Sequence, residues 1–341
     1  MNYFLVILLY GVIFYFINYI FLRNKLLIDK IHSSPHKSFL NKKNVPLTGG
    51  IFFLIIFIFY LKEFDLLEKI FICIIFLIGI SSDINKLRSP ILRLALQTLS
   101  IFLVIQITEI YVLNTRLDYL DFLLNEYPLL SLAFTIFCLL VFVNGSNFID
   151  GVNCLASGYF LTIILILITH LNNIESSELT ILSYDLKIIS IFLFVFIIFN
   201  IFSKSFLGDS GSYFISLTVG LFCIKISFIL QNTMSPFFIA LLFWYPAFEN
   251  LFSILRRKFY QGKNVKYADN LHLHHLLFNV LKQKIDKKFS NPLTGILISL
   301  VNFIFLIIGL NYLNNSLILI FLIIMKSIIY LSLYIFLRKK N

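Results

Sequence analysis

The segment NGSNFIDGVN, residues 144–153, interrupts two long apolar stretches and decides how the whole chain is interpreted. It follows LAFTIFCLLVFV, residues 132–143, and is soon followed by YFLTIILILITHL, residues 159–171. About 20 consecutive apolar residues are enough to span a bilayer, so both flanking stretches predict membrane helices. Amide or acid side chains nevertheless recur at every third position of the segment, at Asn144, Asn147, Asp150 and Asn153.

The composition also indicates a membrane protein. Of the 341 residues, 59% are hydrophobic, 40 are Phe and only 13% are charged, whereas a soluble domain has about 25% charged residues. The first apolar run has no small-residue cleavage site, so we expect it to be retained as a span. The four cysteines lie far apart in or beside apolar runs, which argues against a disulfide framework or a CxxC metal site.

The apolar runs predict an all-α, polytopic integral membrane protein with about ten or eleven transmembrane helices, forming one domain over residues 1–341. The second and third runs are short, so they would tilt little or lie beside a thinned bilayer. The eleven candidate spans are residues 3–22, 49–61, 68–81, 91–113, 128–143, 154–171, 187–202, 212–230, 236–254, 293–312 and 316–337.

The charges separate the connecting segments into two sets. Most lysines and arginines fall in the C-terminal tail and in residues 23–48, 82–90, 144–153, 203–211 and 255–292. The other set carries mainly acids, so the positive-inside rule makes the first set cytoplasmic. The net charge of +11 then reflects orientation and attraction to anionic lipid, and it needs no nucleic acid. Polar motifs far apart in sequence would meet at this face, where water offsets their cost.

Two of these motifs contain an acid at the edge of a predicted helix. Asp209 lies between glycines in FLGDSGSYF, residues 206–214, before a helix expected to begin near residues 210–212. A carboxylate beside a helix N-terminus suits Mg²⁺ with a phosphate, the acid on the metal and the amides on the phosphate. The alternative is an ordinary helix cap. Asp83, which precedes several bases, would contact a metal or lie in a solvated loop.

The other two polar motifs suggest oxygen and imidazole contacts. A helix through residues 144–153 would bring Asn144, Asn147 and Asp150 close to one face. Oxygen ligands without Cys or His suit a hard cation such as Mg²⁺, and packing between helices is the alternative. The histidines of DNLHLHHLLF lack the HExxH spacing of a zinc site. Beside nearby arginines they indicate a phosphate-binding loop or a plain cytosolic loop.

Three charged residues fall in or near the end of apolar runs, where charge is costly. Glu249, near the cytoplasmic end of its span, would cap the helix or pair with the bases that follow. Lys225 would extend its ammonium group to the membrane interface. No role is predicted for Lys326.

Taken in order, PLTGG, SDxxxLxSPxxRL, NxxNxxDG, FLGDSGS and HxHH resemble the motifs of the polyprenyl-phosphate N-acetylhexosamine-1-phosphate transferases, glycosyltransferase family 4, over residues 29–278. Within this family the chain looks closer to the O-antigen-type members, which use undecaprenyl phosphate. The resemblance implies transfer of a sugar 1-phosphate from a UDP-sugar to a polyprenyl phosphate, with release of UMP. This would be the first membrane step of cell-envelope polysaccharide synthesis, at the cytoplasmic face of the inner (plasma) membrane.

The resemblance also implies a cofactor, site residues and an assembly. Mg²⁺ would be the metal, with Mn²⁺ as a substitute, and a homodimer is compatible with the family. Asp83 and Asp150 would be the catalytic acids. The metal ligands would be Asp209, Asn147 and Asn153. The substrate phosphates and nucleotide would be held by Lys42, Asn144, Lys204, His272, His274 and His275.

The chain departs from the family pattern at two places. An Asp–Asp pair is usual where this chain has Ser82–Asp83, and many members have a second acid at the position of Asn153 and a Gly at that of Cys154. A phosphate monoester has a second pKa of about 6, so the lipid phosphate is largely a dianion at neutral pH and needs little help from a base. Asn153 keeps an oxygen ligand and lowers the charge of the site.

Two other functions fit the sequence. A transporter or flippase for an anionic lipid-linked substrate would also have polar groups at broken helices, but near the bilayer midplane and usually with internal repeats. Here the polar motifs cluster at one interface, and the sequence shows no repeat. An inactive family member would follow from the Ser82 replacement.

Overall fold

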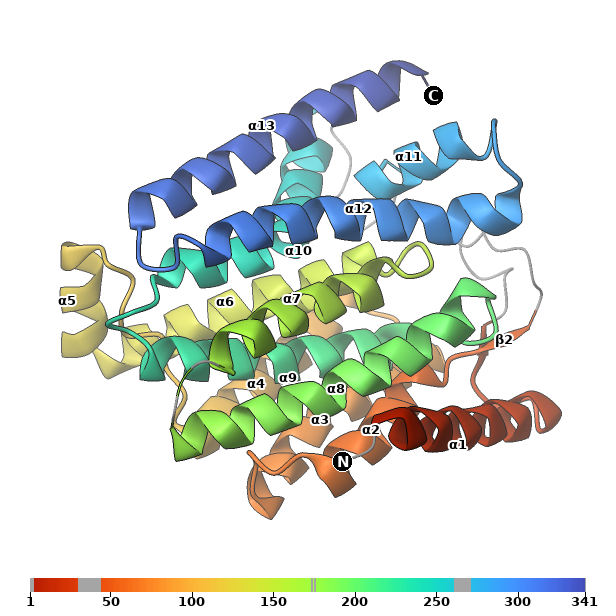
Figure 1. Ribbon diagram of the computed structural model, residues 1–341, viewed down its shortest axis with the longest axis horizontal. Helices are drawn as coiled ribbons and strands as arrows, with labels where there is room; N and C mark the ends of the chain where they lie inside the picture. The colour runs from red at the N-terminus through yellow and green to blue at the C-terminus, as the bar shows by residue number, and fades with distance from the viewer. Residues whose placement is uncertain (1–2, 30–43, 173, 175, 261–270, 341) are drawn as a thin grey trace.

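The computed structural model describes residues 3–29, 44–172, 174, 176–260 and 271–340. Most of the long helices run roughly along one direction and pack side by side (Figure 1). Strands β1 (Ile28–Asp29) and β2 (Val45–Pro46) form a short antiparallel ladder. The α-helices within the described residues are α1 (Tyr3–Arg23), α2 (Gly49–Tyr60), α3 (Leu66–Asp83), α4 (Pro90–Thr108), α5 (Asp118–Glu126), α6 (Pro128–Ile149), α7 (Leu155–Leu171), α8 (Ser177–Ile201), α9 (Gly208–Ile229), α10 (Pro236–Leu255), α11 (Leu273–Leu281), α12 (Lys287–Leu310) and α13 (Ser316–Lys340).

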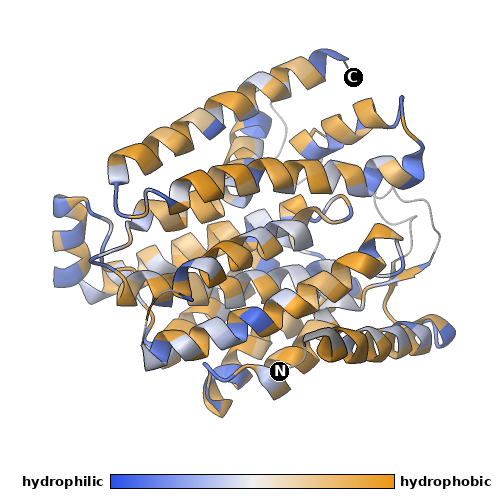
Figure 2. Ribbon diagram, viewed as in Figure 1, coloured by the Kyte–Doolittle hydropathy of each residue, from blue (hydrophilic) through white to orange (hydrophobic). Residues whose placement is uncertain are grey.

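The helices confirm an all-α polytopic membrane protein. Eight helices in the described part of the chain are long and apolar enough to cross a membrane: α1, α4, α6, α8, α9, α10, α12 and α13. The remaining three predicted spans correspond to α3, which has 18 residues, and to the shorter apolar helices α2 and α7. Figure 2 shows apolar residues along most helices, with hydrophilic residues gathered on α5 and at the C-terminal end of α13.

Helix boundaries differ from the prediction where polar residues are buried or cap a helix. The α8 helix begins at Ser177 and not at residue 187, because the Ser176 hydroxyl accepts a hydrogen bond from the Leu179 N–H. Asp185 therefore lies inside a helix, although the sequence placed it in a loop. Its buried carboxylate accepts hydrogen bonds from the backbone N–H groups of Lys62 and Glu63 at 2.8 to 3.0 Å, which fixes the α2–α3 connection.

The predicted loop over residues 144–153 is largely helical. The α6 helix continues to Ile149, so Asn144 and Asn147 lie on its last turns and only the following residues up to Cys154 form the connection to α7. The α9 helix begins at Gly208, before the predicted start near residues 210–212. Two short helices, α5 and α11, were not predicted, and α11 occupies part of the expected loop 255–292.

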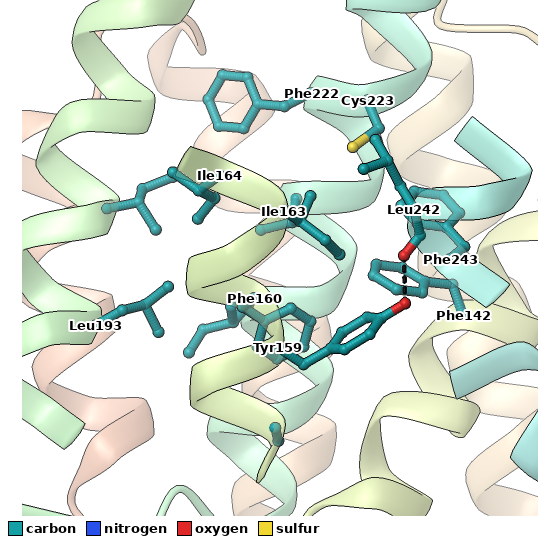
Figure 3. Packing of buried hydrophobic residues seen from close by; sticks show 14 of the residues in the cluster. Phe142, Tyr159, Phe160, Ile163, Ile164, Leu193, Phe222, Cys223, Leu242 and Phe243 are labelled. Atoms are coloured by element: carbon teal, nitrogen blue, oxygen red, sulfur yellow. Dashed lines mark hydrogen bonds between the residues drawn. The ribbon is translucent and has the colours of Figure 1, made fainter. Parts of the chain in front are cut away.

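The interior is packed with aromatic and branched aliphatic side chains. Figure 3 shows part of this core, where the Tyr159 hydroxyl donates to the backbone carbonyl of Leu242. Phe142 and Phe243 stack nearby with their ring centroids 3.8 Å apart. The α9 helix crosses this core, and its side chains from Ser210 to Ile224 are all buried. Its first turn is therefore held rigidly, which matters because Asp209 belongs to that turn.

The polar motifs meet at one end of the bundle, the right-hand side of Figure 1, where β2, α11 and the C-terminus lie. The N–H of Phe206 donates to the carbonyl of Pro46 at 3.0 Å, which joins VPLTGG to FLGDSGS. The Asn153 side chain donates to Ser203 at 2.8 Å, which adds the α6–α7 connection. At the opposite end, Lys225 pairs with Glu63 and with Glu178.

Candidate active site

Asp83 binds the N-terminus of α9 from the end of α3. Its carboxylate accepts the backbone N–H of Asp209 at 2.9 Å and that of Ser210 at 3.1 Å. Gly208 permits this approach, because its φ is +74° and a Cβ there would lie 2.8 Å from an Asp83 oxygen. These two amides are thus occupied by a protein carboxylate. The role expected for amides at this helix start, holding a substrate phosphate, stays a prediction, and in the structure Asp83 occupies these two amides.

Asp209 is the meeting point of four helices. One carboxylate oxygen accepts hydrogen bonds from the Ser82 hydroxyl at 2.5 Å and from Arg93 Nη1 at 3.1 Å. The other accepts the Asn147 side-chain amide at 3.4 Å. That amide also donates to the Tyr213 hydroxyl at 2.7 Å. The Asp209 side chain is 27% exposed, so it is held firmly and can still be reached from outside.

Burial and a neighbouring charge make the ionisation of Asp83 costly. Asp83 lies just beyond the apolar part of α3, and burial together with the charge of Asp209 raises the pKa of its carboxyl to about 7. Arg93 offsets the charge of Asp209 through their ion pair. The Ser82 hydroxyl donates a hydrogen bond to the Asp209 carboxylate. A second acid at position 82 would instead repel that carboxylate. Ser82 and Arg93 thus form a compact unit around one oxygen of Asp209.

The oxygen donors of this cluster fit a hard divalent cation. In the described residues, no group of three or more His, Cys, Asp or Glu side chains is arranged so that it could hold a metal ion. A metal here would take the carboxylates of Asp209 and Asp83, with the side-chain amide of Asn147 beside them. Water and diphosphate oxygens would complete its shell, which is the arrangement Mg²⁺ favours over an all-protein cage. Burial first and the charge of Asp209 second raise the pKa of Asp83, and a bound cation would favour the charged form of this carboxyl.

The histidine motif packs against the end of α6. A Cβ on Gly151 would lie 2.5 Å from His274 Nε2 and 2.9 Å from His275 Nε2, so the connection after α6 passes directly over both rings. The His272 ring lies 5.4 Å from the ring of Phe148. Phe148 follows Asn147, which contacts Asp209. The end of α6 therefore joins the histidines to the carboxylate cluster.

His272 is oriented by a buried acid. Its Nδ1 lies 2.9 Å from a Glu249 carboxylate oxygen and 3.2 Å from the Ser253 hydroxyl. The other Glu249 oxygen accepts the Tyr330 hydroxyl at 2.7 Å. Glu249 is fully buried and pairs with His272, the N-cap residue of α11, whereas the sequence predicted a helix cap or a pair with the bases that follow. Burial and the neighbouring histidines lower the pKa of His274 well below its ordinary value, so His274 is neutral.

The remaining predicted site residues lie at varied distances from this cluster. Asn144 donates its side-chain amide to the carbonyl of Leu140 within α6. Asn153 donates to the Asn200 carbonyl and to Ser203, so its described hydrogen bonds brace the end of α8. Asp150 is half-buried at the C-terminal cap of α6. Lys204 is exposed on the α8–α9 connection, and Lys42 lies outside the described residues.

Sequence reasoning missed Arg93 and Tyr213 as site residues. Arg93 was one of the bases that follow Asp83, but it was not predicted to contact Asp209. Its position was readable, because Ser89 and Pro90 mark the start of α4 and place Arg93 on the first turn beside the end of α3. Tyr213 follows Asp209 by four residues, one turn along α9, so the same helix face carries both.

Comparison with known proteins shows what the central part of the chain is similar to. Residues 67–227 match the family described as glycosyl transferase family 4, and this range contains Asp83, Asn147 and Asp209. The chain is also 30% identical over 169 residues to the decaprenyl-phosphate N-acetylglucosaminephosphotransferase of Mycolicibacterium smegmatis. That alignment covers 45% of this chain and 40% of the relative, so the chain spans two fifths of the length of the curated relative it matches. The central helices, from α3 to α9, are therefore similar to glycosyl transferase family 4.

Proposed function

We propose that this protein transfers a sugar 1-phosphate, an N-acetylhexosamine 1-phosphate, from a UDP-sugar to a polyprenyl phosphate and releases UMP. One observation carries the proposal: Asp83, Asp209 and Asn147 converge from three helices at one end of an apolar bundle. An enzyme that joins a water-soluble donor to a lipid phosphate needs its reacting groups where the membrane meets water. The family match and the name of the similar mycobacterial protein support the same reaction.

The chemistry asks for positioning and charge neutralisation more than for a base. Phosphoryl transfer depends mainly on alignment of the two phosphates and stabilisation of charge. Asp209 and Asp83, with Asn147, would hold Mg²⁺, which when bound would neutralise the diphosphate oxygens. Arg93 lies beside Asp209 at 3.1 Å and would draw an anionic substrate toward the same point. His272, held by Glu249, would contact the phosphates or the nucleotide.

The positively charged end of the bundle would face the cytoplasm, where UDP-sugars are made. In this orientation the reaction would be the first membrane step in building a cell-envelope polysaccharide at the inner (plasma) membrane. The lipid acceptor would reach the site from the bilayer side, and UMP would leave to the cytosol.

A direct assay tests the proposal. Purified protein in detergent with Mg²⁺, a polyprenyl phosphate and a panel of radiolabelled UDP-N-acetylhexosamines should transfer label into the organic-extractable fraction. UMP should be released in equal amount. Uptake of a lipid-linked sugar into proteoliposomes, without UMP release, would instead indicate a transporter, and neither activity with any donor would indicate an inactive family member.

A further inference from the structure

Lys326 is a cation buried near the middle of a membrane helix. It lies 10 residues after Ser316 and 14 before Lys340, the ends of α13. At about 1.5 Å per residue, the ends are about 15 and 21 Å away. The side chain is 4% exposed, and its ammonium group finds no hydrogen-bond partner among the described residues. A charge at this depth is expensive, so such residues usually serve a function.

Two aromatic rings lie beside the ammonium group. Lys326 Nζ lies 4.6 Å from the ring centroid of Trp244 and 5.7 Å from that of Phe305. The face of an aromatic ring attracts a cation, but it does not neutralise the charge or accept conventional hydrogen bonds. The donors of Lys326 are therefore still available to an acceptor.

Lys326 lines a cavity of about 110 Å³ between α10, α12 and α13. The wall is otherwise almost wholly apolar, and its other polar lining groups include Asn302, whose side-chain oxygen also has no partner within the described residues. Leu297 and Val301 on α12, with Ile329 on α13, line the cavity and are also exposed on the outer surface. The cavity thus communicates with the lipid-facing side, where Figure 1 shows α12 and α13 diverging toward α11.

We propose that this cavity binds the carboxylate head of a long-chain alkyl acid, with Lys326 as its counter-ion and the alkyl chain passing out between α12 and α13. The carboxylate would accept hydrogen bonds from Lys326, and the protonated form of the acid would donate to Asn302. The pair is neutral overall whichever partner holds the proton, so no net charge enters the membrane interior.

Charge and size favour a carboxylate over a phosphate. A phosphate monoester carries about −1.5 to −2 at pH 7, whereas Lys326 is the only cationic side chain among the described residues that line the cavity. A second negative charge would therefore be buried without a partner. A volume of about 110 Å³ is also smaller than the ~150 Å³ cavity that holds a benzene ring. It fits a small head group and the first carbons of a chain, not a sugar phosphate.

The protein contains its own reporter for this site. Trp244 is the single tryptophan of the chain and lines the cavity beside Lys326. A brominated stearic acid should quench its fluorescence with saturation in detergent-purified protein, and ordinary stearate should reverse the quenching. Lys326→Met should raise the concentration of brominated acid at half-maximal quenching about tenfold or more, the loss of affinity expected when one charge-assisted contact is removed. Lys339→Met, an exposed lysine on the same helix, should leave it unchanged.

Two comparisons on the wild-type protein keep the test decisive even if Lys326→Met does not fold. The brominated methyl ester should quench only weakly, because it lacks the anionic head. Equal saturable quenching by ester and acid would overturn the ion pair. Displacement by a polyprenyl phosphate at lower concentration than stearate would assign the cavity to the lipid acceptor instead, and quenching without saturation would show that no site exists.

Discussion

At the scale of single residues, Asp209 and Asp83 are joined through the first turn of α9, and Asp209 also pairs with Arg93. Asp209 stands out because glycines flank it at a helix start, and Asp83 because it ends an apolar run. Arg93 and Tyr213 could not be assigned in the same way, because their contacts with Asp209 and Asn147 depend on how α4 and α9 pack. A residue type and a local pattern do not specify a partner on another helix.

Replacing Asp209 by Asn should reduce transfer at least about tenfold at saturating Mg²⁺, since loss of a metal-binding charge costs several kcal/mol of transition-state stabilisation. The measurement is the rate of label transfer by purified protein, with Asp118→Asn at the opposite end as the matched control. Equal elution volumes would show that both variants fold. A variant that keeps more than about a tenth of the wild-type rate would remove Asp209 from the metal site.

Ser82 and Asp83 should differ sharply although they are neighbours. Ser82→Ala loses one hydrogen bond to Asp209, worth about 1 kcal/mol, so the maximal rate should stay within about tenfold. Asp83→Asn weakens both contacts to the start of α9 and should lower the rate much further. In all variants the rate should fall below about pH 6, as the lipid phosphate takes up a proton.

The pH–rate profiles of wild type, Ser82→Ala and Ser82→Asp provide the check on this reasoning. If Ser82→Asp raises the rate strongly and shifts the acid limb, a second carboxylate is needed. The native protein would then be a weak member of its family.

At the scale of helices, each apolar run of the sequence corresponds to a helix of the structure, but capping and close packing set the helix boundaries. The early start of α8 follows from the Ser176 cap and from the burial of Asp185 against another connection. The short α11 helix packs against α12 and α13, which cover its apolar side chains. Such features belong to pairs of helices, so a single run of sequence does not predict them.

The crossing of α3 and α9 should be sensitive to a single methyl group. A Cβ on Gly79 would lie 2.3 Å from the Cα of Ser210, so Gly79→Ala must push the two backbones apart. Overpacking of this kind costs about 1–3 kcal/mol, and it should lower both the unfolding temperature in detergent and the transfer rate. Gly11→Ala is the matched control, because nothing lies within 4 Å of a Cβ there. Unfolding of both variants at the wild-type temperature would contradict the close contact.

At the scale of the whole molecule, alternation of charge grouped the five motifs correctly on one end, and the contacts between them confirm the grouping. Hydrophobic length and the positions of lysine and arginine were sufficient for this. They could not predict that Gly151 would lie against His274 and His275, because the four helices α7 to α10 separate these residues in the sequence.

The two ends of the bundle should be reached by reagents from opposite sides of the membrane. Lys284→Cys, exposed between α11 and α12, should react with a membrane-impermeant thiol reagent only from the cytoplasmic side. Asn125→Cys, exposed on α5, should react in intact cells from outside, and the native cysteines are buried or half-buried. Labelling of Lys284→Cys from outside would invert the orientation and with it the proposed access of UDP-sugars.

The first turn of α9 has a further consequence for how the protein responds to its membrane. It is clamped between α2 and α3, since a Cβ on Gly50 would lie 2.6 Å from the Gly211 nitrogen and one on Gly79 would touch Ser210. Backbone meets backbone there, with no side chain between to change its rotamer. Changes in bilayer thickness act on helix tilt and on lipid-facing side chains. The distance between the carboxylates of Asp83 and Asp209 is therefore expected to change little when the thickness of the surrounding bilayer changes.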